Sequence, residues 1–328
     1  MTTSFKQFIC TVTVLVSIFI TVGATGRQRS MMRIVDYNLL EGMTLDSKNE
    51  YENFINWVNE QNPDILALEE TNGISEEQLQ GLAAKWGHPY VATNCNYPGA
   101  SSYPVAITSK YELEDLQHIV GDVHHGGIAA RINGVEVVVL HLYPFAELKH
   151  KLRWADPQDL DMDGDKDGDD FRIHELQVYM NATQGRNDGQ DGQSGNGITN
   201  GKSRKNGITN GKSRKNGKNN IPVLIMGDFN SHSPLDKEHD QNKHSYNVHS
   251  WMLDHYQDLL KIKHPEWVRT YPTIWKGWHP GANEYRIDYI YGSKNIKKRD
   301  IRRVEVIHDE FTENYSDHYP ILLDITIN

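Results

Sequence analysis

Short apolar runs, each ending in polar residues, recur along the chain. Several are apolar at consecutive positions, which is typical of strands in a sheet that is covered on both faces. The turn at Arg131–Gly134 joins two of these runs and predicts an antiparallel hairpin. We expect strands near residues 32–37, 64–68, 104–108, 127–132, 135–141, 222–227, 286–291 and 320–327.

Between these runs, apolar residues recur at the i, i+3, i+4 and i+7 spacing of amphipathic helices. The first such helix ends before Pro63, and Ser75 with Gln78 forms a capping box at the start of the second. The marking residues are Tyr51, Phe54, Ile55 and Val58; Leu79, Leu82, Ala83 and Trp86; Ile173, Leu176 and Met180; and Val248, Trp251, Met252, His255 and Leu259. The alternation of strands and helices predicts a mixed α/β fold in which helices cover buried sheets.

The N-terminal segment predicts the compartment. An uncharged apolar stretch from Phe8 to Val22 is followed by Gly23-Ala24, a small-residue pattern suited to signal peptidase. The stretch is shorter than the roughly 20 apolar residues that span a bilayer. We therefore expect residues 1–24 to be a cleaved signal peptide and the mature protein to be secreted, without stable membrane insertion. A membrane anchor formed by the uncleaved segment is the alternative.

The formal net charge of −10 is unevenly distributed. Residues 185–220 carry eight Lys or Arg against two Asp, and they contain a perfect ten-residue repeat, 197–206 copied as 207–216. Because Gly, Asn, Ser and Lys offer little to bury, we expect a disordered linker. A basic tether for nucleic acid, glycans or acidic lipid is the alternative. The charge balance of the whole chain neither requires nor excludes a nucleic-acid partner.

A second insert, residues 156–170, is acidic and matches a calcium-binding loop. Aspartates occupy positions 1, 3, 5, 7, 9 and 12 of the loop pattern, and Gly164 at position 6 permits its sharp turn. The match departs at position 12, which is Asp instead of the longer Glu, and at position 8, which is Lys166. We expect Ca²⁺ to bind here, and a solvated acidic loop is the alternative. The expected ligands are Asp159, Asp161, Asp163, Asp165, Asp167 and Asp170.

Polar side chains stand where five of the predicted strands meet their loops. They are Asn38, Glu69-Glu70, His141, Asp228 with Asn230, and Asp317-His318. Catalytic groups of α/β proteins gather at strand ends, so this pattern predicts one active site.

The carboxylates in this set suit hydrolysis of a phosphate ester. That reaction needs charge neutralisation and an activated water. Glu70 and Asp317 are hard oxygen ligands of the kind that bind Mg²⁺ or Mn²⁺. Asp228 is expected to orient or deprotonate the attacking water, and Asn230 to hold that water or a phosphate oxygen.

Two histidines complete the predicted chemistry. Asp288, inside a further predicted strand, is the natural partner that would fix the tautomer of His318 and raise its basicity. His141 can donate a hydrogen bond to the phosphate or protonate the leaving oxygen. Each residue also has a structural interpretation, because a single His after a strand is more often a hydrogen-bonding core residue. The hypothesis rests on finding them together.

In these motifs the sequence resembles the endonuclease/exonuclease/phosphatase superfamily, typified by deoxyribonuclease I. The resemblance spans residues 33 to 327, so we expect one domain over 31–328 with the two inserts. The matching pieces are Tyr37-Asn38, Asp64-Ile65-Leu66-Ala67-Leu68-Glu69-Glu70, His141-Leu142, Gly227-Asp228-Phe229-Asn230, Arg286-Ile287-Asp288-Tyr289-Ile290 and Ser316-Asp317-His318-Tyr319-Pro320.

The resemblance implies a four-layer sandwich of two mixed sheets flanked by helices, and metal-dependent cleavage of phosphoester bonds. It implies the following roles: Glu70 as the metal carboxylate, Asn38 and Asp317 beside the metal, His141 and His318 as catalytic histidines, Asp228 and Asn230 at the phosphate, and Asp288 as the support of His318. Glu69 stands where many members have Gln.

The substrate stays open at this level, because one fold hosts many functions. Secretion leaves an extracellular nuclease acting on DNA or RNA, a sphingomyelinase-like phosphodiesterase, or an enzyme for a small phosphoester. We expect a monomer. A hypothesis of another class is a catalytically inactive, secreted calcium-binding scaffold, which the calcium loop and the sequons at Asn181 and Asn314 would suit. The filled acid–base positions argue against it.

Overall fold

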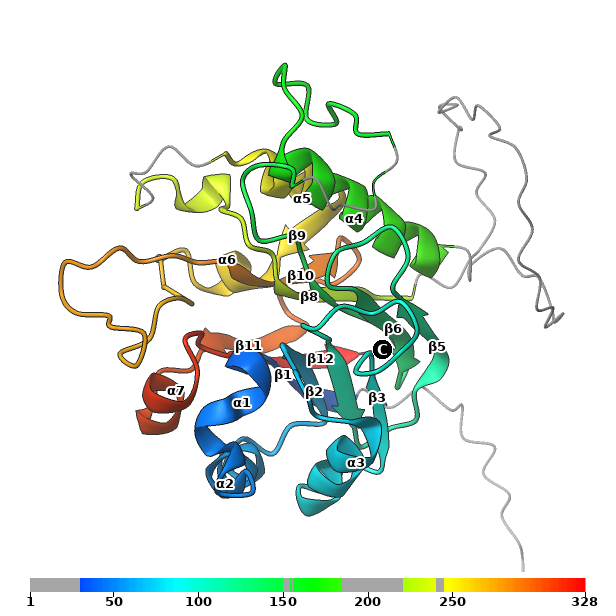
Figure 1. The fold of residues 1–328 in the computed structure, drawn as a ribbon, viewed down its shortest axis with the longest axis vertical. Helices are drawn as coiled ribbons and strands as arrows, with labels where there is room; N and C mark the ends of the chain where they lie inside the picture. The colour runs from blue at the N-terminus through cyan, green and yellow to red at the C-terminus, as the bar shows by residue number, and fades with distance from the viewer. Residues whose placement is uncertain (1–29, 150–153, 155, 185–220, 240–244, 328) are drawn as a thin grey trace, which may run out of the picture.

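Two six-stranded mixed sheets pack face to face in the computed structural model (Figure 1). The structure describes residues 30–149, 154, 156–184, 221–239 and 245–327. The first sheet has the order β11 (Ile301–Val306), β12 (Ile321–Ile327), β1 (Ser30–Asn38), β2 (Ile65–Glu69), β4 (Ala106–Ser109) and β3 (Tyr90–Thr93). The second has the order β5 (Glu114–Ile119), β6 (Gly127–Ile132), β7 (Val135–His141), β8 (Val223–Asp228), β10 (Asp288–Ser293) and β9 (Tyr256–Asp258).

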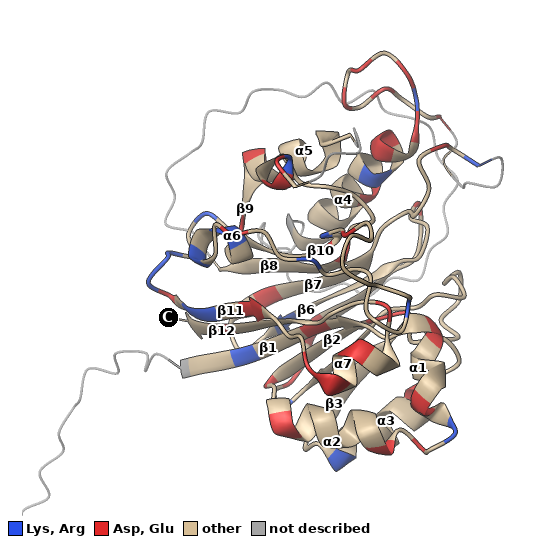
Figure 2. Ribbon diagram, turned by 90° about the vertical axis from the view of Figure 1, so that its left-hand side faces the viewer, with Lys and Arg blue, Asp and Glu red and all other residues tan. Residues whose placement is uncertain are grey.

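Helices cover the outer faces of both sheets, which completes a four-layer sandwich (Figures 1 and 2). The first sheet carries α1 (Leu40–Ser47), α2 (Glu52–Gln61), α3 (Glu76–Lys85) and α7 (Glu310–Tyr315). The second carries α4 (Gly168–Gln184) and α5 (Asn247–His255), while the short α6 (Leu259–Lys263) lies beside β10 and β11. The predicted mixed α/β sandwich is therefore confirmed.

Strand β7 shows why a central strand of this fold has apolar residues at consecutive positions. Val137 and Val139 point into the core between the two sheets, whereas Val138 and Leu140 point into the core beneath α4 and α5. All four are fully buried. Because successive strand side chains face opposite sides, a strand with helices on one face and a sheet on the other buries every residue.

The strand directions bring the predicted site residues to one edge of the sandwich. β1 and β2 are parallel, so their C-terminal ends lie side by side, and the same holds for β7 and β8. β12 runs antiparallel to β1, and β10 antiparallel to β8, so these two strands begin at the same edge. Asp228 is paired in register with both His141 and Asp288.

The structure differs from the predicted elements in several places, and helices α1 and α7 were not predicted. β3, β5, β9 and β11 were not predicted, and each is short or has exposed positions that dilute its apolar pattern. The fourth predicted helix is broken, since α5 ends at His255 and Leu259 begins α6. The break arises because residues 256–258 pair with β10 as strand β9. Tyr51 lies before α2, with φ of 61°, and is not part of its first turn.

The expected signal peptide at residues 1–24 and the basic repeat at 185–220 lie outside the described residues. In the described ranges, every helix is too short or too polar to cross a membrane.

Candidate active site

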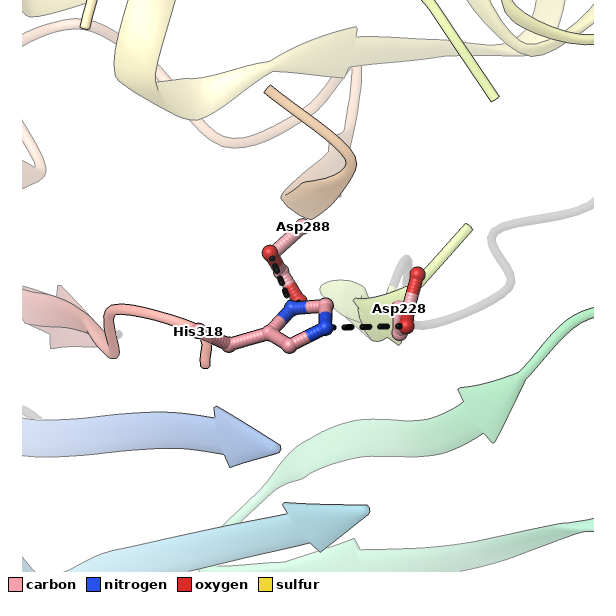
Figure 3. Close-up of side chains that lie close together, drawn as sticks. All are labelled: Asp228, Asp288 and His318. Atoms are coloured by element: carbon pink, nitrogen blue, oxygen red, sulfur yellow. Dashed lines mark hydrogen bonds and ion pairs between the residues drawn. The ribbon is translucent and has the colours of Figure 1, made fainter. Parts of the chain in front are cut away.

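His318 lies in the loop that leads into β12, and Asp288 holds its ring (Figure 3). The His318 Nδ1 atom is 3.0 and 2.9 Å from the two carboxylate oxygens of Asp288, at the start of β10. The His318 backbone N–H donates to Ser316 Oγ at 3.2 Å, which fixes the loop. Burial would lower the pKa of His318, but nearby aspartates, Asp288 foremost, outweigh burial and raise it well above its ordinary value. His318 is therefore an imidazolium at neutral pH.

Asp228, the last residue of β8, lies between the two histidines. Its Oδ2 atom is 3.8 Å from His318 Nε2 and 3.6 Å from His141 Nε2. Asn38 Nδ2 donates to the same oxygen at 3.2 Å, and the Asn230 backbone N–H donates to Oδ1 at 2.8 Å. Burial raises the pKa of Asp228 to about 8, although the charge of His318 acts in the opposite direction. At neutral pH most of Asp228 is therefore the protonated acid, and its ionised fraction is a stronger base than an ordinary carboxylate.

His141, the last residue of β7, has a different environment. Its side chain is buried, and no described residue forms a hydrogen bond with its Nδ1 atom. Burial, together with the charges of His318 and His124, lowers the pKa of His141 to about 3. His141 is therefore a neutral imidazole at neutral pH, and it can donate a hydrogen bond but holds no extra proton to give to a leaving oxygen.

Asn38 and Glu70 lie at the adjacent ends of β1 and β2. Asn38 Nδ2 donates to Glu70 Oε1 at 3.3 Å, and the Glu41 backbone N–H donates to Glu70 Oε2 at 3.0 Å. Burial raises the pKa of Glu70, and the negative charge of Asp317 adds to this effect. Asp317 in turn forms an ion pair with Lys276, with 3.1 Å between Oδ2 and Nζ.

A hard divalent cation such as Mg²⁺ or Mn²⁺ prefers oxygen donors, which the carboxylates of Glu70 and Asp317 carry. Asn38 turns its Nδ2 atom toward Glu70, and its Oδ1 atom accepts a hydrogen bond from the Leu40 backbone N–H at 3.1 Å. The Glu70 carboxylate is disfavoured by its burial and by its acidic neighbour, and a bound cation would relieve both costs. Asp228, Asp288 and His318 also place ligand atoms within 4.8 Å of one another. Because His318 is already hydrogen-bonded to Asp288, the group of Asp228, Asp288 and His318 is better suited to proton transfer than to metal binding.

Unusual backbone conformations place several of these groups. Glu70 and Asn230 have φ of 53° and 47°, values that cost a non-glycine residue free energy and that cluster at functional sites. Gly227 has φ of 135°, and a Cβ there would lie 1.9 Å from the Leu140 carbonyl oxygen. Glycine is therefore required directly before Asp228. Asn230 Nδ2 donates to the Leu142 carbonyl at 3.1 Å, which ties the end of β8 to the end of β7.

The acidic insert lies on the α4 and α5 side of the molecule. The structure gathers its aspartates in two overlapping groups, Asp159, Asp161 and Asp170, and Asp165, Asp167 and Asp170, with ligand atoms within 4.8 Å in each. Asp163 is in neither group. Asp170 is fully buried and accepts hydrogen bonds from the backbone N–H groups of Leu160, Asp161 and Asp167. Gly164 has φ of 105°, as its turn position requires.

Sequence reasoning missed three features of the site. The ion pair of Lys276 with Asp317 was not predicted, because a contact between two segments that are distant in the chain leaves no local pattern. His125 packs on His141, and the His124-His125 pair was the available signal. Asp36, on β1, pairs with the strand-end residue Glu69 as two buried carboxyl groups, and burial raises the pKa of each well above its ordinary value. A proton shared within that pair would account for two adjacent buried acids.

The sequence profile described as Endonuclease/Exonuclease/phosphatase family matches residues 37–318, which include all the strand-end residues above. No curated protein matches the chain significantly.

Solved structures match over 90% of this chain, each with a TM-score of 0.58. One is a 3′ phosphatase from Neisseria bound to a product DNA hairpin, with 18% identity and 99% of that chain covered. Another is an AP endonuclease from Archaeoglobus fulgidus, with 16% identity and 100% covered. A third is a 3′-5′ exonuclease from Neisseria meningitidis, with 18% identity and 99% covered. At these identities the comparison establishes a shared fold.

Proposed function

The chain belongs to the endonuclease/exonuclease/phosphatase family and is a phosphate-ester hydrolase, and from this premise we propose that it is a secreted, divalent-metal-dependent phosphodiesterase that cleaves nucleic acid. One observation carries the proposal. Three titratable groups lie side by side at one edge of the two sheets. They are His318, charged and held by Asp288; Asp228, a carboxyl group with a pKa of about 8; and His141, which is neutral.

In the proposed reaction, Asp228 takes a proton from the attacking water, whose oxygen forms the new bond to phosphorus. This step uses the ionised form of Asp228, which is the minority form at neutral pH and whose raised pKa makes it the stronger base. Asn230, fixed beside it, orients the water or a phosphate oxygen. The bond from phosphorus to the leaving oxygen then breaks, and the His318 imidazolium gives that oxygen its proton. Asp288 stabilises the charged His318 ring before the transfer and orients it during the reaction.

His141 supports the same reaction without changing its protonation. As a neutral donor buried beside Asp228, it stabilises negative charge that develops on a phosphate oxygen. The alternative that His141 protonates the leaving oxygen is disfavoured by its low pKa.

We assign the Mg²⁺ or Mn²⁺ site to Asn38, Glu70 and Asp317. A cation held there would neutralise charge on the phosphate and act as a Lewis acid. The contribution of the chain is to keep Glu70 in place through Asn38 and the Glu41 N–H, and to supply Asp317 beside His318.

A nucleic acid is the preferred substrate for two reasons. Two solved structures with this fold are described as an AP endonuclease and as a phosphatase bound to a DNA hairpin. In this chain, Trp275 is 43% exposed in the loop whose next residue, Lys276, reaches Asp317. An aromatic ring for stacking and a cation for the phosphate backbone are what a single strand requires.

A sphingomyelinase-like activity is the second candidate, because Ile274 beside Trp275 is 51% exposed. Two adjacent exposed apolar residues near the site also suit a lipid surface.

The deciding experiment is cleavage of supercoiled plasmid DNA by the mature protein in Mg²⁺, with His318→Ala and an EDTA-treated sample as controls. We expect nicking by the wild type alone. Cleavage of sphingomyelin vesicles with intact plasmid would transfer the proposal to the lipid candidate. Equal plasmid nicking by His318→Ala would overturn the mechanism.

We further propose that the loop at 159–170 binds Ca²⁺ as a structural site remote from the chemistry. Its support is the sequence pattern and the two gathered groups that share Asp170. Calcium titration monitored by thermal unfolding tests it, with Mg²⁺ at equal concentration as the control. The proposal fails if Ca²⁺ stabilises the protein no more than Mg²⁺ does.

A further inference from the structure

The ring of His125 lies parallel to that of the catalytic His141. The ring centroids are 4.2 Å apart and the planes differ by 26°. His125 is 5% exposed and stands in the loop between β5 and β6, so it reaches the site from a segment that carries none of the other site residues. We propose that His125 is a positioning residue that fixes the orientation of the His141 ring by stacking against its face. This inference rests on the proposed function.

His141 needs such a support because it lacks the one that His318 has. Asp288 orients His318 through hydrogen bonds to Nδ1, whereas no described residue bonds to Nδ1 of His141. A side chain with one long contact, 3.6 Å from Nε2 to Asp228, is free to rotate about χ2 unless its faces are packed. His125 supplies that packing.

The His125 ring is itself held on several sides. Its Nδ1 atom lies 3.2 Å from Ser101 Oγ, and Tyr103 packs on it edge to face with 5.3 Å between ring centroids. Gly126, with φ of 92°, follows it and makes the turn into β6. A residue held this firmly can transmit its position to the ring that it covers.

One buried carboxylate links the His125 loop to the segment that follows His141. Glu175 on α4 accepts a hydrogen bond from the His124 backbone N–H at 2.7 Å and another from the Tyr143 backbone N–H at 2.9 Å. The two segments are therefore held at a fixed separation, which is the condition for constant ring stacking.

The stack also keeps water and charge away from His141. The charged or titratable groups that face it are His125, His124, His318 and Asp228. Burial lowers the pKa of His125 well below its ordinary value, so the stacked ring is neutral and adds no charge beside His141.

The test compares His125→Ala with His125→Phe, which retains a flat ring but no nitrogen. Turnover of bis(4-nitrophenyl) phosphate in Mg²⁺ is the assay. We expect His125→Ala to lower kcat by about 10- to 100-fold with KM within about twofold, as for a misplaced catalytic group. His125→Phe should restore kcat to within about threefold of the wild type. In a His141→Ala background, His125→Ala should have no further effect on kcat.

Three kinetic results would overturn the proposal: wild-type kcat in His125→Ala, an equal loss in His125→Phe, or additive losses with His141→Ala. An equal loss in the Phe variant would mean that the nitrogens of His125, and not its flat ring, carry its role, either through Ser101 or on the substrate. If His125→Ala does not fold, Ser101→Ala replaces it, since it frees the His125 ring and should give a smaller loss of kcat alone.

A second readout does not need activity. In wild-type protein labelled with ¹³C-histidine, the His141 ring signal should not titrate between pH 5 and 8. In His125→Ala, water reaches the ring and its apparent pKa should move up into that range, while His125→Phe keeps the wild-type behaviour. An unchanged His141 signal in His125→Ala would refute the positioning role. An inactive wild type that shows the expected NMR shifts would instead refute the proposed function alone.

Discussion

The two histidines that we propose for catalysis, His141 and His318, lie on either side of one aspartate, yet their surroundings give them opposite protonation states. His318 enters from the loop before β12 and meets Asp288 of the opposite sheet, so it is charged. His141 ends β7, is covered by His125, and is neutral. The residue type is the same, and the difference comes from the partner: a carboxylate raises the pKa of an imidazole, whereas burial under an uncharged ring lowers it.

The largest loss of activity is expected when the charged histidine is removed. His318→Ala should lower kcat/KM by about 10⁴-fold or more, because the proton donor and its positive charge are lost together. Plasmid nicking and bis(4-nitrophenyl) phosphate turnover in Mg²⁺ measure it, with thermal unfolding to verify the fold. Activity within tenfold of the wild type would exclude His318 from the chemistry.

Removing only the partner should cost somewhat less. Asp288→Asn keeps the shape but allows the wrong tautomer of His318, and we expect a loss of about 10³-fold in kcat. The pKa of His318 should fall, which ¹³C-histidine NMR detects directly. A His318 signal that titrates as in the wild type would show that other acids, not Asp288, hold its charge.

Removing the neutral histidine should cost less again. His141→Ala deletes one hydrogen-bond donor, and we expect a loss of about 10²-fold in kcat. Because His141 does not titrate near neutrality, the shape of the pH–rate profile between pH 5 and 9 should stay as in the wild type. A lost limb in the profile would mean that His141 exchanges a proton after all.

The low pKa of His141 also predicts an effect on stability. The unfolded chain binds a proton near pH 6.5 and the folded one only near pH 3, so this contribution is complete above 6.5 and is lost as pH falls toward 3. Each pH unit in that window should remove about 1.4 kcal/mol. In urea unfolding with EDTA present, the free energy of unfolding should therefore fall less steeply with decreasing pH for His141→Asn than for the wild type. Parallel curves would contradict the low pKa.

The smallest effect on activity is expected at the acidic loop. Asp165→Ala, at an exposed member of one gathered group, should leave kcat within about twofold of the wild type, because the loop lies outside the chemistry, and should reduce the stabilisation by Ca²⁺. Asp156→Ala, an exposed acid outside the loop pattern, is the matched control. A variant that loses activity while still responding to Ca²⁺ would contradict the separation of the two sites.

Much of the fold was predictable because it rests on local patterns. The buried central strands β1, β2, β7, β8 and β12 each have consecutive apolar residues, and the capping box of Ser75 and Gln78 begins α3 as expected. β5 was missed because three of its six residues are exposed, so packing against β6 and not its own pattern makes it a strand.

The site divides in the same way. The strand-end rule identified His141, Asp228 and Asp317-His318 from sequence, because the end of an apolar run is visible there. His125 and Lys276 were not identified, since their roles come from contacts with residues that are distant in the chain.

The sequence by itself pointed to the polar residues that the structure gathers at one edge of the sandwich, because polarity at a strand end is a local property. The tertiary structure alone decided the protonation states. Whether a histidine is charged depends on the balance between burial and neighbouring charges, and those neighbours come from other strands. Asp288 reaches His318 only because β10 and β12 begin at the same edge of facing sheets, and no local pattern records that meeting.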